Sequence, residues 1–245
     1  MIPGAFPIIA GAAPYKANAV HYDGSSYLRT TSALTGAVGG TQGTLSIWLK
    51  PTSNGTPIFV IGSNLSVQLV INSNSPNVVQ CAVRTTGGTG VGQVNSGTSG
   101  IAAPAAAWHS IICSWDSSIP TAKFILDGVD VTSSLYGAGT IGWNASGCAV
   151  AAFSSNPGNA KYEGDMSELF VDQRYIDLSI SSNVAKFRNA TGKPAFLGIN
   201  GERVFGTAPL VYLPNPAATV NVNQGSGGDF TITGSLTQAS TSPSD

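Results

Sequence analysis

Short apolar runs separated by turn-forming residues recur along this chain and constrain its fold more than any other feature. In the run 109–115, Ile111, Cys113 and Trp115 share one face of an extended strand, because side chains alternate along a strand. Runs of this kind, bounded by Gly, Ser, Asn and Pro, predict β-strands. Residues 85–100, rich in Gly, Thr and Ser, show no periodicity and are expected to form a surface loop. The expected strands are 27–30, 44–50, 58–61, 66–71, 78–84, 109–115, 123–126, 148–153, 166–171, 209–213 and 229–236.

The scarcity of charge supports an all-β fold. Charged residues make up 9% of the chain, whereas an ordinary globular protein carries about 25%. Long amphipathic helices need Lys, Glu and Arg on their solvent-facing side, and this composition cannot supply them. One short helix is expected at 181–188, with Ser179 or Ser181 as its N-cap and with Val184 and Phe187 on its apolar face.

Composition also weighs against several classes of function. The chain has eleven basic and twelve acidic residues and no basic stripe, so no nucleic-acid partner is expected. No apolar run approaches the ~18 residues of a membrane span, so none is expected. Cys81, Cys113 and Cys148 are odd in number and far apart, which favours three buried strand residues over a disulfide framework or a zinc site.

The N-terminal residues 1–19 are interpreted as an extended apolar arm. They lack a basic leader region, and Pro3 and Pro7 interrupt their apolar run, unlike a signal peptide. An apolar terminus needs a surface to hold it, so we expect this arm to dock on its own domain or on a neighbour during assembly. The arm residues expected to make that contact are Ile2, Phe6, Ile8 and Ile9.

The remainder divides into two regions without a composition shift large enough for a second domain. Residues 20–190 are expected to form one β-sandwich, which is a normal size for a single all-β domain. Residues 191–245, rich in Gly, Pro and Asn, form a tail that is expected to add strands to the sandwich or to wrap its surface.

Five segments in order resemble the laminin G-like and pentraxin-like branch of the concanavalin A-like sandwiches. The resemblance implies a jelly roll of two antiparallel sheets. Asp127-Gly128 corresponds to the hairpin turn of the family, and Ser167 stands where the family usually has Asp. The segments are 20–28 (VHYDGSSYL), 43–51 (GTLSIWLKP), 108–116 (WHSIICSWD), 122–129 (AKFILDGV) and 162–171 (YEGDMSELFV).

The tail carries a second resemblance, to laminin G-like proteins of tailed phages. It lies in residues 187–198, 206–213, 225–236 and 242–245. This resemblance implies a non-enzymatic virion protein, either a head decoration or a tail-associated module, assembled in the host cytoplasm. Its expected partners are other virion proteins in a symmetric oligomer and, as a further expectation, a glycan of the host surface.

A different function is suggested by three acids in one strand. Glu163, Asp165 and Glu168 match the Glu-x-Asp-x-x-Glu signature of the laminarinase-like glycoside hydrolases, which share this fold. Retaining hydrolysis needs two carboxyl groups about 5 Å apart. A strand bulge would bring Glu168 to the same face as the other two. The alternative is that the ordinary closing strand of the family has two acidic neighbours by chance.

An exposed aromatic residue would suit a sugar-binding surface. Trp143 lies in a loop sequence and is the candidate for stacking on a glycan, although burial as a loop anchor is the alternative. Trp48, Trp108 and Trp115 lie in strand segments and are expected in the core.

No cofactor is required by the sequence, but the family resemblance is compatible with calcium. Oxygen ligands from loops would hold it, and no EF-hand-like spacing selects among the acids. The available aspartates are Asp23, Asp116, Asp127, Asp130 and Asp172.

Overall fold

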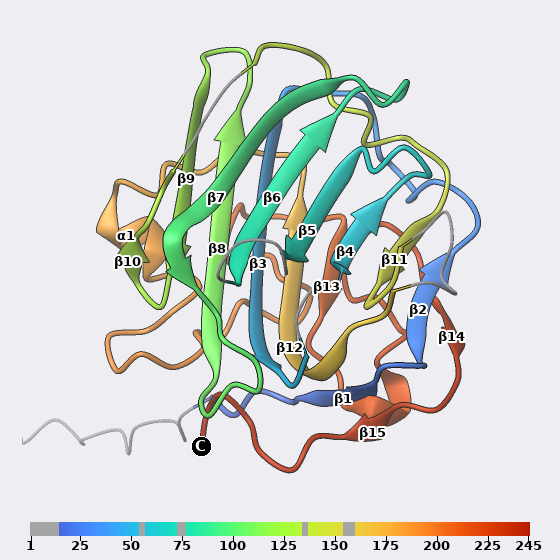
Figure 1. Cartoon of the computed structure of the whole chain (residues 1–245), viewed down its shortest axis with the longest axis vertical. Coiled ribbons are helices and arrows are strands. Elements are labelled where there is room, and N and C mark those ends of the chain that lie inside the picture. The colour runs from blue at the N-terminus through green and yellow to red at the C-terminus, as the bar shows by residue number, and fades with distance from the viewer. Residues whose placement is uncertain (1–14, 54–56, 73–76, 134–136, 154–159) are drawn as a thin grey trace, which may run out of the picture.

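The computed structural model describes residues 15–53, 57–72, 77–133, 137–153 and 160–245 as two antiparallel β-sheets stacked face to face. Figure 1 shows one sheet in front of the other, with the C-terminal segments running around the back and the lower edge. The expected all-β jelly-roll sandwich is confirmed. Among the described helices, none is long and apolar enough to cross a bilayer.

The first sheet, called sheet A, has eight strands in the order β10-β9-β8-β3-β12-β1-β15, with β13 also paired to β12. All its pairs are antiparallel, and the Asp127-Gly128 turn joins β9 to β10 as expected. Its strands are β1 (Val20–Asp23), β3 (Gln42–Pro51), β8 (His109–Asp116), β9 (Thr121–Leu126), β10 (Val129–Asp130), β12 (Glu163–Asp172), β13 (Val211–Leu213) and β15 (Thr237–Gln238).

The second sheet, sheet B, has seven strands in the order β14-β2-β11-β4-β5-β6-β7. This sheet joins segments from both ends of the chain, because β14 from the tail pairs with β2 near the N-terminus. Its strands are β2 (Tyr27–Thr30), β4 (Pro57–Ile61), β5 (Val67–Ile71), β6 (Val78–Arg84), β7 (Gly90–Gly100), β11 (Cys148–Val150) and β14 (Thr231–Thr233).

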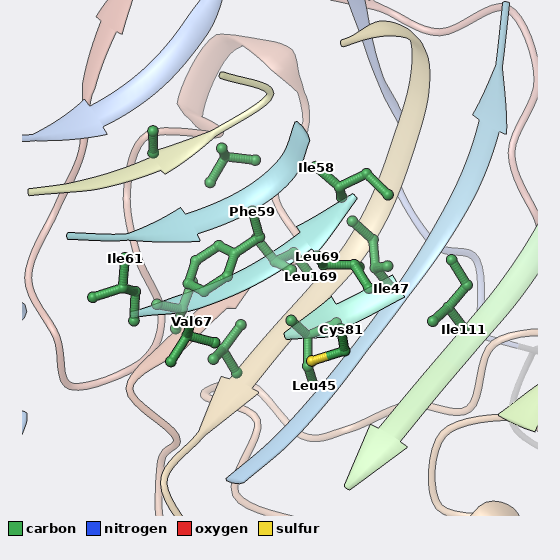
Figure 2. Close-up of a cluster of buried hydrophobic side chains, with 14 of the residues drawn as sticks. Leu45, Ile47, Ile58, Phe59, Ile61, Val67, Leu69, Cys81, Ile111 and Leu169 are labelled. Carbon is green, nitrogen blue, oxygen red and sulfur yellow. The ribbon is translucent and has the colours of Figure 1, made fainter. Parts of the chain in front are cut away.

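The main core fills the space between the two sheets. Leu45 and Ile47 of β3 meet Phe59 and Leu69 of sheet B, as Figure 2 shows, and all four are fully buried. Alternate side chains of β3 and β5 point into this layer, as sandwich packing requires. The three cysteines are buried and free, and Cys81 lies within the same cluster.

A second apolar cluster lies on the outer face of sheet A. Ile112 and Phe170 point outward from β8 and β12, and the segments that follow β12 cover them with Phe187, Leu197 and Val204. The face of sheet A that would otherwise meet solvent is therefore packed against helix α1 (Ser181–Val184) and the start of the tail.

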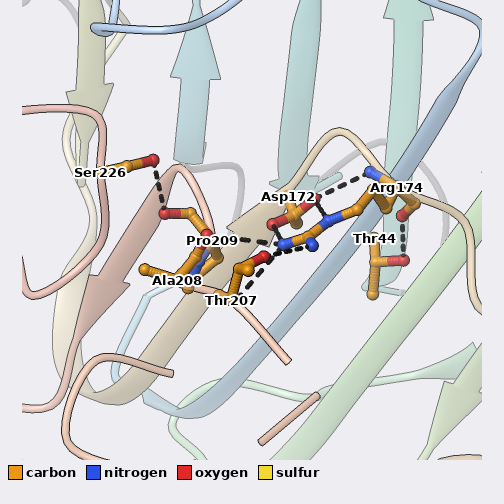
Figure 3. Close-up of polar contacts among 7 residues, drawn as sticks. All are labelled: Thr44, Asp172, Arg174, Thr207, Ala208, Pro209 and Ser226. Carbon is orange, nitrogen blue, oxygen red and sulfur yellow. Dashed lines mark hydrogen bonds and ion pairs between the residues drawn. The ribbon is translucent and has the colours of Figure 1, made fainter. Parts of the chain in front are cut away.

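The tail residues 191–245 supply the strands β13, β14 and β15 and a single 3-10 turn, η1 (Ala217–Thr219). A clasp around Arg174 attaches them to the end of β12 (Figure 3). Its guanidinium makes paired hydrogen bonds to Asp172 at 2.8 and 2.7 Å and donates to Thr207 Oγ1 at 2.7 Å. Such a planar fork is well suited to bridging a carboxylate and a neighbouring loop.

The prediction of a surface loop at 85–100 is wrong for most of that segment. Gly90–Gly100 is strand β7, paired with β6. The register shifts twice along this pair, between Val78 and Gln80 and between Val83 and Arg84. These irregularities hide the two-residue alternation that would have revealed the strand.

The helix is shorter than expected, and its capping differs. It spans Ser181–Val184, and Ile180 occupies the N-cap position without a side-chain cap. Ser179 instead donates to Asp177 Oδ1 at 2.6 Å. Phe187 lies beyond the end of the helix, so it does not form a helix face with Val184, although it is buried in the same apolar cluster against which Val184 packs.

Candidate functional site

A bulge in β12 determines where the three candidate catalytic acids lie. The pairing of β12 with β3 shifts register between Ser167 and Phe170, and Glu168 adopts a left-handed φ of 56°. Met166 and Leu169 both face the core as a result. The sequence pattern thus anticipated a bulge at this place.

The bulge does not assemble the three acids into an open cleft. Glu163 is exposed beside Gly24, and Asp165 Oδ1 lies within hydrogen-bond distance of His21 Nδ1, at 2.7 Å. Glu168 is only 3% exposed. A carboxyl group this deeply covered cannot reach a sugar ring, so Glu163 and Glu168 do not form the accessible acid pair that the motif implies.

Two phenols enclose Glu168. Tyr15 donates to its Oε1 at 2.6 Å and Tyr212 donates to its Oε2 at 2.8 Å. Burial raises the pKa of Glu168 to about 7, although both hydrogen bonds favour the ionised form. Its role is therefore to join the root of the arm, β12 and β13.

Trp143 is not an exposed platform, which corrects its candidacy as a glycan-stacking residue. Its side chain is fully buried, its indole stacks on Trp115 at 5.9 Å between ring centroids, and its Nε1 donates to Gln42 O at 3.0 Å. Trp143 is therefore a buried anchor of its loop, which was the alternative prediction. Gly43 allows the stack, because a Cβ there would lie 2.2 Å from the Trp115 ring.

The other tryptophans differ in burial. Trp48 and Trp115 are each 4% exposed and lie in the core as expected. The core expectation is wrong for Trp108, which precedes β8 and is partly exposed; its Nε1 donates to Thr241 Oγ1 at 3.2 Å, so it anchors the end of the tail.

The five aspartates named for calcium do not form a metal site. Each already has its own partners: Asp23 accepts from Ser25, Asp116 from Gln42, Asp127 from Ser110, Asp130 from Lys123 and Asp172 from Arg174. Within residues 15–245, leaving out the undescribed gaps, no group of three or more His, Cys, Asp or Glu side chains could hold a metal ion. These five aspartates therefore do not fit a calcium site.

The expected contact residues of the arm, Ile2, Phe6, Ile8 and Ile9, lie outside the described residues. The root of the arm is described from Tyr15 onward. The Tyr15 ring packs on Phe196 at 5.1 Å, and Ala17 N donates to Ser244 Oγ at 2.9 Å.

An open polar groove of about 820 Å³ lies on sheet B beside the β9–β10 hairpin. Gln80 and Asn95 are direct cross-strand partners on β6 and β7. Their neighbours Cys81 and Val94 point into the core, so the two amides point away from it. Figure 1 shows β6 and β7 in the front layer with β10 beside them.

The lining of this groove is almost free of charge. It combines amides and hydroxyls with the small apolar surfaces of Val78, Val129 and Val131, and Asp130 is the one ionisable group among its described lining residues. The described polar lining residues are Asn72, Gln80, Gln93, Asn95, Ser96, Thr98, Ser99, Asp130, Thr132 and Ser133. The sequence could have revealed this face only if 90–100 had been recognised as a strand, since its amides then align with those of β6.

Comparison with known proteins defines the family. A laminin G family model matches residues 22–175, which is more than half of the chain. This model describes the concanavalin A-like lectin/glucanases superfamily. The chain belongs to the concanavalin A-like lectin/glucanases superfamily. No curated protein sequence matches this superfamily member.

Two solved structures extend the likeness beyond the matched range. A native heptameric SAP-like pentraxin from Limulus polyphemus has a TM-score of 0.58 and 16% identity, with 93% of this chain and 97% of that chain covered. A Bacteroides ovatus protein, named for a proposed role in carbohydrate binding, has a TM-score of 0.65 and 13% identity. It covers 94% of this chain, which spans only 62% of that protein. At these identities the likeness shows the superfamily fold alone.

Proposed function

We propose that this protein is a non-enzymatic recognition module that binds a glycan in the groove over β6 and β7, beside the β9–β10 hairpin. The observation that carries the proposal is the lining of that groove: amides, hydroxyls and small apolar surfaces in an open space of about 820 Å³. Ligand sites commonly have volumes of about 300–1,000 Å³ and use a few placed polar groups to orient the ligand. Sugars present hydroxyls and apolar C–H faces, which match this lining.

Gln80 can offer its side-chain amide to such a ligand. No hydrogen bond within the described chain occupies its side-chain amide, which can both donate and accept. Val129 and Val131, from the side of the β9–β10 hairpin, can contact the C–H groups of a sugar, and Val129 is 61% exposed. The fold supports the same ligand class, because the Bacteroides ovatus protein of similar fold is named for carbohydrate binding.

The proposal is tested by screening the full chain on an array of neutral and acidic glycans and measuring the affinity of each hit by calorimetry. Gln80→Ala should weaken binding by several-fold to about tenfold, the size of one or two lost hydrogen bonds. Thr231→Ala, an exposed hydroxyl at the opposite edge of sheet B, is the matched control and should bind normally. Equal affinity of the parent and the Gln80→Ala protein would place the ligand elsewhere, and the absence of any hit would remove the function.

We also propose that the module is a surface component of a tailed-phage virion, present there as a symmetric oligomer. The resemblance of residues 187–245 to the tails of phage-encoded laminin G-like proteins supports this setting. Imaging of native particles with this chain labelled should locate it on the head or the tail. Native particles that carry no label on either the head or the tail would contradict the proposal.

A further inference from the structure

Asp130 is held in a fixed orientation at the edge of the groove. Its Oδ1 accepts from the Thr132 backbone N–H at 3.1 Å and from the Thr132 hydroxyl at 2.6 Å, and its Oδ2 accepts from Lys123 Nζ at 2.5 Å. Thr132 is itself fixed, because its Oγ1 accepts from Phe124 N at 2.9 Å. The carboxylate is thus supported from the β9–β10 hairpin by a chain of hydrogen bonds.

This carboxylate keeps the capacity for one more hydrogen bond. An ionised carboxylate has about four acceptor positions, and three are used by Lys123 and Thr132. Burial opposes its ionisation, but hydrogen bonds from Lys123 and Thr132 outweigh that effect and lower the pKa of Asp130. It therefore remains a pure acceptor at neutral pH, and a ligand must offer it a donor such as a hydroxyl.

The groove offers no compensation for a second negative charge. Neither Lys, Arg nor His occurs among its described lining residues, and Lys123 is already paired with Asp130. A ligand carboxylate placed near Asp130 would meet a like charge, and no cation among the described lining residues remains to pair with it, which is unfavourable.

We infer that Asp130 determines specificity in this groove: it accepts one ligand hydroxyl and makes the groove select neutral glycans over acidic ones. The inference rests on the proposed glycan function of the same groove. Lys123 and Thr132 are positioning residues, since their hydrogen bonds hold the Asp130 carboxylate in place.

The test compares sugars that differ only in a carboxylate: cello-oligosaccharides, each paired with the same oligosaccharide whose terminal glucose is replaced by glucuronate. For the parent, the neutral member of each bound pair should be favoured. Asp130→Asn should lower affinity for the neutral sugar about tenfold, by weakening a hydrogen bond to a charged acceptor. It should also raise relative affinity for the acidic sugar, a change that simple misfolding would not produce.

Removing Asp130 leaves Lys123 unpaired, and this cation could itself attract an acidic sugar. The double variant Lys123→Met with Asp130→Asn removes that effect and should still lose the preference for neutral sugars. Lys123→Met alone keeps the carboxylate and should keep the preference. Unchanged selectivity in both Asp130 variants, with the parent still binding, would overturn the inference and leave the glycan function standing. Failure of the parent to bind any glycan would instead overturn the function itself and the inference with it.

Discussion

Tyr15 donates a hydrogen bond of 2.6 Å to Glu168, across 153 positions of sequence. This contact joins the root of the N-terminal arm to the bulge of β12, and Tyr212 from β13 completes the enclosure at 2.8 Å. The acid that best fits a catalytic motif is thus a buried junction between three parts of the chain. Its burial gives the protein a specific dependence on pH.

The stability of the protein should fall as pH rises from about 5 to 8. The folded-state pKa of Glu168 is raised from 4.5 to about 7, so its contribution is fully present below the unfolded value and is lost as pH rises through the folded value. The full effect is on the order of 3 kcal/mol. Glu168→Gln cannot titrate, and the difference in unfolding free energy between it and the parent, from urea titrations, should change with pH in this window. A constant difference would contradict the assignment.

The hydrogen bond from Tyr212 to Glu168 should stabilise the protein more at pH 8 than at pH 5. Tyr212→Phe keeps the ring and removes one donor to the Glu168 carboxylate, which should raise the pKa of Glu168 further. At pH 8 the lost charge-assisted hydrogen bond should cost about 1.5–3 kcal/mol of stability. At pH 5, where Glu168 is protonated, the cost should be smaller. Chemical denaturation at both pH values measures this, and equal costs at both would contradict a charged Glu168 at pH 8.

The stacked tryptophans should make Gly43 intolerant of a side chain. A Cβ at Gly43 would lie 2.2 Å from the Trp115 ring and 2.6 Å from the Trp143 ring. Gly43→Ala should therefore destabilise the protein by about 1–3 kcal/mol through overpacking. Gly90→Ala is the matched control, because nothing lies within 4 Å of its added Cβ. The midpoint temperature of thermal unfolding measures this difference. An equal decrease of the midpoint in both variants would argue against a tight Trp115–Trp143 stack.

The three acids of β12 should not hydrolyse β-glucans. Glu163 and Glu168 differ sharply in exposure, and no pair of them faces an open cleft together. A reducing-sugar assay of the parent on laminarin should show no turnover above buffer. Turnover that Glu163→Gln abolishes, with normal folding, would restore the hydrolase alternative.

The sequence predicted most strands of the sandwich because they are short apolar runs bounded by turn-forming residues. The run 78–84 matches β6, and the Asp127-Gly128 turn joins β9 to β10. The pattern failed at β7, where glycines and register shifts mask the alternation. That one error concealed the groove, since its amides come partly from β7.

The candidate site was harder to predict than the fold because burial depends on distant segments. Nothing local to Glu168 shows that Tyr15 and Tyr212 cover it, or that Trp115 covers Trp143. The bulge itself was legible, since Met166, Leu169 and Val171 all require the core. Sequence patterns therefore reported the backbone more faithfully than they reported access to solvent.

Chemical-shift mapping of the isotope-labelled chain, titrated with a neutral oligosaccharide selected on the array, tests the groove most directly. The account predicts shifts of the Gln80 side-chain amide and of backbone amides at Thr98 and Asp130, with little change around Glu163. Shifts centred on β12, or saturating binding that leaves Gln80 and Asp130 unmoved, would contradict it.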